Sequence, residues 1–168
     1  MKRKILFLSI MLVAFLCMGC SGADTDLSGD NVTFSGNAQV RVFSADGGEW
    51  TIDESVMNQA PLLTFETTQG KSGEEPETNV HRGILLKDIL AQAGVDVDGI
   101  NAIQCTSFDG FSKIYSKEDL EDSEKLFLTF EMDGELLTYE QQDCFFIVVK
   151  NENFKQNWTK YLMEIEIS

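Results

Sequence analysis

Apolar side chains recur at helical spacing over residues 85–93 and then give way to strand-like runs. Five apolar residues share one face of the expected helix and three polar residues fall on the other: Leu85, Leu86, Ile89, Leu90 and Ala93 against Lys87, Asp88 and Gln92. Gly94 supplies the left-handed residue that commonly ends a helix. From Ile100 the pattern favours a strand, and Asp109-Gly110 predicts a hairpin turn into a second strand over residues 111–115.

Before this helix the pattern predicts mainly strands. Residues 32–34, 39–43, 49–52 and 62–68 have the apolar, β-branched and aromatic content of strands, with Asp46-Gly47-Gly48 turning the second into the third. Asp53 is placed to cap a short helix that runs through Asn58. Residues 69–79 form a long polar interruption, for which a loop over a site and disorder are both open interpretations.

After residue 115 the pattern again predicts one short helix and several strands, up to the end of the sequence. Ser116 and Asp119 have the spacing of a capping box for a helix through Asp122. Strands are expected over 125–132, over 135–137 after an Asp-Gly turn, over 144–150 in the middle of a sheet, and in half-buried form over 158–167. The fold class is therefore α+β: a β-rich mixed sheet or barrel with a few short helices.

The first nineteen residues have the pattern of a targeting segment. Three basic residues precede an apolar run over 5–16, and the sequence Cys17-Met18-Gly19-Cys20 follows. A glycine directly before Cys20 resembles a bacterial lipobox, although Cys17 stands where leucine is typical. We expect a lipoprotein signal peptide over 1–19, a lipid on Cys20, a flexible tether over 20–31 and a single domain over 32–168. An ordinary secretory signal and a single membrane-spanning helix remain open alternatives.

Charge narrows the range of partners. The 168 residues carry a formal charge of −15, and loss of residues 1–19 leaves 10 basic against 28 acidic residues, a charge of −18. Nucleic acid and anionic membrane surfaces are then poor partners, and the acidity is read as a solvated exterior. We expect contact with a membrane only through the lipid on Cys20, on the extracytoplasmic side of a bacterial membrane.

Catalytic motifs are sparse. With Cys17 removed and Cys20 lipidated, Cys105 and Cys144 remain, and they are either a disulfide or two separate buried thiols. His81 is the one histidine, and the expected mature chain has no Cys-x-x-Cys pair, no Gly-x-Ser-x-Gly elbow and no phosphate-binding glycine loop. The sequence therefore assigns no catalytic residue and no metal ligand.

A family resemblance runs over residues 49–168. Four motifs follow one another in order. They are Gly83-Ile84-Leu85-Leu86-Lys87-Asp88-Ile89-Leu90, Ala93-Gly94-Val95, Phe108-Asp109-Gly110-Phe111, and Lys160-Tyr161-Leu162 with Ile165. Together they resemble the oxidoreductase molybdopterin-binding domain of the sulfite-oxidase type, with Tyr161 where tryptophan is usual. The resemblance implies a β-rich fold with a cleft for an anionic pterin cofactor.

The resemblance also implies site residues, and the set is incomplete in this sequence. The family's catalytic members bind molybdenum through a cysteine upstream of the helix motif, but no cysteine occurs between Leu62 and Arg82. The candidate cofactor-binding residues that the likeness indicates are His81, Arg82, Asp109, Phe111 and Lys160, with Arg41 as a further basic candidate. The other interpretation of His81-Arg82 is a solvated strand end that holds no ligand.

Two functions from different classes follow. The first is a lipid-anchored, non-catalytic module that keeps the molybdopterin-domain fold and binds an unknown small ligand or partner protein. The alternative is a molybdenum-cofactor-dependent oxidoreductase of the oxygen-atom-transfer type with atypical metal ligation. A third reading is an accessory subunit that scaffolds a surface redox complex.

Overall fold

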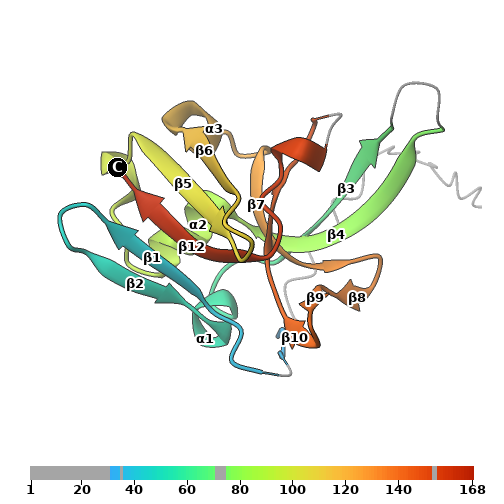
Figure 1. Ribbon diagram of the computed structural model, residues 1–168, viewed down its shortest axis with the longest axis horizontal. Helices are drawn as coiled ribbons and strands as arrows, with labels where there is room; N and C mark the ends of the chain where they lie inside the picture. Colours follow the sequence, from blue (N-terminus) through green and yellow to red (C-terminus); the bar gives the residue numbers. More distant parts are fainter. Residues whose placement is uncertain (1–30, 35, 71–74, 153–154) are drawn as a thin grey trace, which may run out of the picture.

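Two five-stranded sheets dominate the computed structural model, which describes residues 31–34, 36–70, 75–152 and 155–168 (Figure 1). The first sheet has the order β2-β1-β12-β5-β6 and consists of β1 (Val40–Ser44), β2 (Glu49–Ile52), β5 (Ala102–Ser107), β6 (Ser112–Ser116) and β12 (Leu162–Ile167). The second has the order β11-β7-β4-β3, with β8 paired to β7, and consists of β3 (Leu63–Gln69), β4 (Glu77–Leu85), β7 (Leu126–Met132), β8 (Glu135–Leu136) and β11 (Phe146–Val149). The expected β-rich fold with few short helices is confirmed.

Smaller elements connect and flank these sheets. The short helices are α1 (Glu54–Met57), α2 (Leu86–Gln92) and α3 (Lys117–Glu121), with 3-10 turns η1 (Val97–Gly99) and η2 (Lys155–Asn157). A separate two-stranded hairpin joins β9 (Thr138–Tyr139) to β10 (Gln142–Asp143). In Figure 1 this hairpin lies below the second sheet, on the side of the segment that leads into β1.

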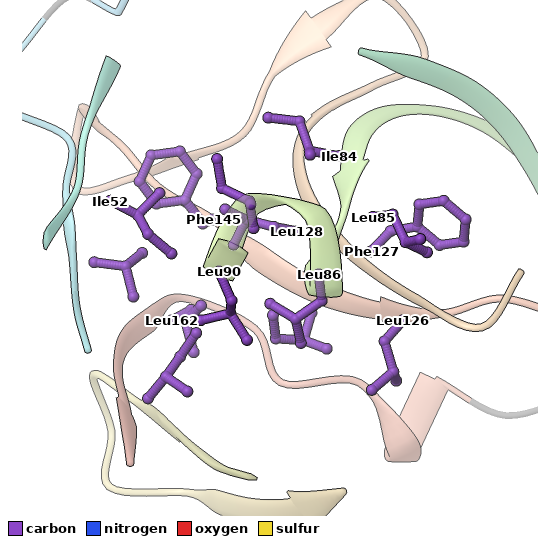
Figure 2. Close-up of a cluster of buried hydrophobic side chains, with 14 of the residues drawn as sticks. Ile52, Ile84, Leu85, Leu86, Leu90, Leu126, Phe127, Leu128, Phe145 and Leu162 are labelled. Atoms are coloured by element: carbon purple, nitrogen blue, oxygen red, sulfur yellow. The ribbon is translucent and has the colours of Figure 1, made fainter. Parts of the chain in front are cut away.

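Helix α2 is confirmed and packs into the core. Leu86, Ile89 and Leu90 are buried, and Figure 2 shows Leu86 and Leu90 in one cluster with residues of β7 and with Leu162 of β12. Gly94 follows with φ +92°, a backbone conformation that favours glycine and ends the helix. The helix motif therefore positions the core between the two sheets.

The predicted turns and caps are also confirmed. The β1–β2 hairpin and the β5–β6 hairpin are both antiparallel, the latter turning at Gly110 with φ +83°. Asp53 accepts a hydrogen bond from the Val56 amide at the start of α1. Ser116 and Asp119 make the reciprocal bonds of a capping box at α3.

The placement of two late strands differs from expectation. The strand over 144–150 is shorter, as β11, and forms an edge of the second sheet instead of its middle. It is nevertheless fully buried because Ile147 bridges to Thr159, and Trp158 donates to the Val149 carbonyl at 3.3 Å. An unbroken apolar run thus indicates a strand that is buried on both faces. An edge strand such as β11 meets this condition when other parts of the chain cover it.

Strand β12 lies in the middle of the first sheet, parallel to β1 and antiparallel to β5. A β-bulge between Leu162 and Glu164 shifts the register there. Leu162 therefore joins Ile165 in the core, whereas Met163 is half exposed. The expected alternation of buried and exposed side chains along this strand is therefore wrong at Leu162 and Met163, because of the bulge.

Two further expectations are corrected, and one open alternative is decided. Residues 32–34 form no strand, although Val32 and Phe34 are buried. Within the long polar interruption, Gln69 belongs to β3 and residues 77–79 belong to β4, so the connection shortens to 70–76, of which 71–74 lie outside the described residues. Cys105 and Cys144 are free thiols, so the interpretation as two separate thiols holds.

The expected signal segment over 1–19, the lipid-bearing Cys20 and the tether up to residue 30 lie outside the described residues. Among the helices of the described chain, none has the length and apolarity needed to cross a bilayer.

Candidate functional site

A cavity of about 520 Å³ opens where the segment before β1, the β9–β10 hairpin and the start of β12 meet. Its walls combine aromatic, amide and carboxylate side chains: Phe108, Tyr139, Tyr161, Gln39, Gln142 and Asp143. This size falls within the range of small-molecule sites, and mixed apolar and polar walls are usual for such sites. We call it the aromatic cavity.

A continuous row of aromatic rings forms one side of the aromatic cavity. Phe108 lies 5.0 Å from Tyr139, and Tyr139 lies 4.7 Å from Tyr161, centroid to centroid, both at an interplanar angle of 48°. Phe146 extends the row behind Tyr161 at 5.2 Å and 86°. These separations are typical of favourable ring contacts.

The backbone fixes this row from two directions. Phe108 follows β5 at the β5–β6 turn, and its amide donates to the Tyr161 carbonyl at 2.9 Å. Tyr161 has φ +52°, in the left-handed region that is costly for a bulky residue. The turn and the strained Tyr161 together bring two rings from distant parts of the sequence to one wall.

The charged side chains of the cavity are mainly acidic. Arg41 pairs with Glu164 at 3.2 Å across β1 and β12, and Asp143 contributes a second carboxylate from β10. The Arg41 side chain is 69% exposed, so this ion pair adds little stability and leaves the guanidinium neutralised by its neighbour. The cavity offers an anion little net positive charge.

Cys144 also lines the cavity, but as a thiol. Burial, with the Asp143 carboxylate nearby, raises the pKa of Cys144 to about 11. Burial raises the pKa of the Cys105 thiol as well. Since the thiolate is the form that binds metal and attacks electrophiles, neither cysteine is activated at neutral pH.

His81 is a core residue of β4 in this structure. It is 1% exposed, its Nε2 lies 2.8 Å from the Thr67 hydroxyl, and its ring stacks on Phe65 at 5.2 Å. The edge of the imidazole also meets Trp158 at 5.4 Å. These contacts place the imidazole within the packed interior.

Arg82 follows His81 on the same strand, so the two side chains point to opposite faces of the sheet. Its guanidinium lies 3.3 Å from the Glu131 carboxylate and 5.9 Å from the Phe130 ring centroid. The side chain is 19% exposed and already engaged with an acidic partner. The two residues therefore do not converge on one ligand.

The remaining candidates lie at the other sheet. Asp109 accepts from the Phe111 amide at 3.0 Å and so shapes the β5–β6 turn, where Phe111 is exposed. The Lys160 ammonium lies 6.0 Å from the Phe146 ring centroid. None of the five candidate residues lines the aromatic cavity, and of the sequence candidates Arg41 alone does so.

The sequence does not predict the aromatic row. Tyr139 lies in a two-residue strand within residues 138–143, for which the pattern predicts no element, and Tyr161 stands out in the sequence only as a departure from a family pattern. The sole sequence signal was three aromatic residues, each close to a predicted strand end. Nothing in their spacing indicates that the rings meet.

A molybdopterin cofactor needs a soft ligand for the metal and cations for its phosphate. Arg82 and Arg41 are paired with carboxylates, and His81 is packed in the interior. These three candidate residues therefore do not form a cluster of cations that would hold the phosphate of this cofactor.

The fold itself is similar to that of one solved molybdenum-type dehydrogenase, which is compatible with the β-rich fold that the resemblance predicts. The supporting likeness is to the solved structure of the sulfane dehydrogenase SoxCD from Paracoccus pantotrophus, with a TM-score of 0.59 and 16% identity. The match covers 77% of this chain but only 38% of that chain, and at this identity it shows the fold alone. No protein-family model matches the sequence, and comparison with curated proteins gives no match.

Proposed function

We propose that this protein is a non-catalytic module that binds a small ligand or a partner through the aromatic cavity of a sulfite-oxidase-like fold. The observation that carries the proposal is the make-up of that cavity: an aromatic wall with carboxylates, where a pterin site needs cations and a metal-binding thiolate. A fold can keep its architecture while its site changes chemistry.

The proposal includes export and a lipid anchor. Residues 1–19 act as the signal peptide, Cys20 carries the lipid, and the segment up to residue 31 tethers the domain outside a bacterial membrane. The support is the order of basic, apolar and Gly-Cys positions in the sequence. The large excess of acidic residues then keeps the domain away from anionic headgroups.

A second candidate is a molybdenum-cofactor oxidoreductase with atypical ligation. The observation in its favour is the fold likeness to a sulfane dehydrogenase. It requires metal ligands other than those that the family pattern supplies.

Metal and pterin analysis separates the two functions. The full chain is expressed in a bacterium that makes the molybdenum cofactor, with a known molybdenum enzyme expressed alongside as a control for cofactor supply. We expect the purified protein to contain molybdenum and pterin fluorescence far below one equivalent while the control enzyme is loaded. One molybdenum and one pterin per chain would establish the second candidate instead.

A further inference from the structure

We propose that the aromatic cavity binds a small organic cation, of the alkylammonium or quaternary ammonium class. The inference rests on the proposed function, because it names the class of ligand for the same cavity. Three independent features of the described residues carry it: the ring geometry, the charge of the walls and a cation that the chain itself places on the row.

The rings of the row are tilted against one another, and Phe108 reaches solvent. Phe108, Tyr139 and Tyr161 meet at 48°, so the rings are tilted and do not cover one another as they would in a flat stack. Phe108 is 55% exposed. Aromatic faces carry a partial negative charge and attract cations, most strongly where water is excluded.

The wall charges favour the same ligand class. Asp143 and Glu164 line the cavity, and Arg41 is the one basic side chain among its lining residues. Among the residues that line the cavity, two carboxylates therefore stand against one guanidinium. A chain of formal charge −15 adds a long-range potential that concentrates cations and repels anions.

The chain already places an ammonium group against this row. The Lys160 ammonium lies 6.0 Å from the centroid of Phe146, which is the ring behind Tyr161. This distance is within the usual range for a cation–π contact. The exposed end of the row presents the same type of surface to a ligand.

The test compares a cation with a neutral molecule of the same shape. The full chain, kept in a non-ionic detergent, is titrated by calorimetry with choline, with tetramethylammonium and with 3,3-dimethylbutan-1-ol, in which carbon replaces the charged nitrogen of choline. We expect saturable binding of both cations, weakened by added salt, and binding of the neutral alcohol at least about tenfold weaker.

Matched variants locate the binding. Phe108→Leu and Tyr139→Leu each remove one ring, and we expect each to weaken choline binding about three- to tenfold. Ile114→Ala truncates a side chain that is 63% exposed on the same sheet and outside the cavity, and it leaves binding unchanged. Tyr139→Phe keeps the ring and should retain binding. Weak binding of Tyr139→Leu alone can then be assigned to loss of the ring, once both variants are shown to be folded.

Two results would overturn the inference. One is equal binding of choline and its neutral isostere without salt dependence; the other is no saturable binding of either cation to the folded protein. The molybdenum analysis of the same preparation is a separate readout. A cofactor-free protein that binds no cation refutes the ligand class alone, whereas one molybdenum per chain refutes the proposed function as well.

Discussion

Asn58 binds both backbone polar groups of Val32: its Oδ1 accepts from the Val32 amide at 2.7 Å, and its Nδ2 donates to the Val32 carbonyl at 3.0 Å. The Phe34 amide donates to Glu54 at 2.9 Å, from the same helix region. The Phe34 ring then meets Phe145 edge-on at 5.4 Å. The segment before β1 is thereby fixed to α1 and to the core without pairing as a strand.

Replacing Asn58 by alanine removes both of these hydrogen bonds. We expect Asn58→Ala to lower the free energy of unfolding by about 1–3 kcal/mol, because the buried Val32 loses the partners of its amide and carbonyl. Urea denaturation followed by circular dichroism measures the change. Gln59→Ala is the control, since its side chain is exposed and its bonds are replaced by water. Equal effects of the two variants would contradict the role given to Asn58.

Asp119 gives the stability a defined pH dependence. Burial raises the pKa of its carboxyl, but hydrogen bonds from Lys125 at 2.5 Å and from the Ser116 amide at 3.0 Å outweigh burial and hold the pKa below its ordinary value. A carboxyl with a lowered folded-state pKa stabilises the protein above its unfolded pKa of about 3.9, and that contribution is lost as pH falls through the folded value.

We therefore expect Asp119→Asn to lower the free energy of unfolding by about 1 kcal/mol at pH 7. The difference from the unmodified protein should shrink below about pH 4 and vanish at lower pH. Urea denaturation over a pH series measures it. Glu124→Gln changes an exposed carboxylate of the adjoining turn and should leave the curve within about 0.5 kcal/mol. A difference that grows toward acid would have the wrong sign for this account.

Gly83 lies where β4 approaches β7 closely. A Cβ at this position would be 2.6 Å from the Leu128 carbonyl oxygen and 3.1 Å from Thr129 Cα, both backbone atoms. Gly83→Ala should therefore cost about 1–3 kcal/mol of unfolding free energy through forced shifts of the strand. Gly36→Ala, whose Cβ would meet no atom within 4 Å, is the control. Thermal unfolding compares the two, and an unchanged Tm for Gly83→Ala would show that the strands separate at little cost.

The proposed lipid anchor rests on Cys20 alone. Cys20→Ala should abolish incorporation of a labelled fatty acid and move the protein out of the membrane fraction, because the lipobox pattern places the lipid on the cysteine that directly follows the glycine. Cys17→Ala is the matched control and should keep both label and location. Persistent membrane association of Cys20→Ala without label would favour a membrane-spanning helix instead.

Local chemistry explains what the sequence predicts correctly. Leu86, Ile89 and Leu90 mark a helix because their spacing places them on one buried face, whatever lies opposite. Ser116 with Asp119, and glycine at position 110, specify their cap and turn through neighbours only. Such features depend on a few adjacent residues and are visible before any fold is known.

Features that depend on distant pairing are not visible in this way. The contact of Tyr139 with Tyr161 requires the β9–β10 hairpin to meet the start of β12, and neither strand's position follows from its own residues. His81 stands in a polar stretch of sequence, yet Trp158 and Phe65 enclose it. Tertiary surroundings decide both the burial of His81 and the contact of Tyr139 with Tyr161, and neither can be derived from the neighbouring residues in the sequence.

The central place of β12 sets the order in which the domain can fold. This strand joins the β1–β2 hairpin to the β5–β6 hairpin, and its residues are made after all of theirs. The first sheet therefore cannot be complete until residue 167 has been added to the chain. Pairing between strands that lie far apart in the sequence generally slows folding.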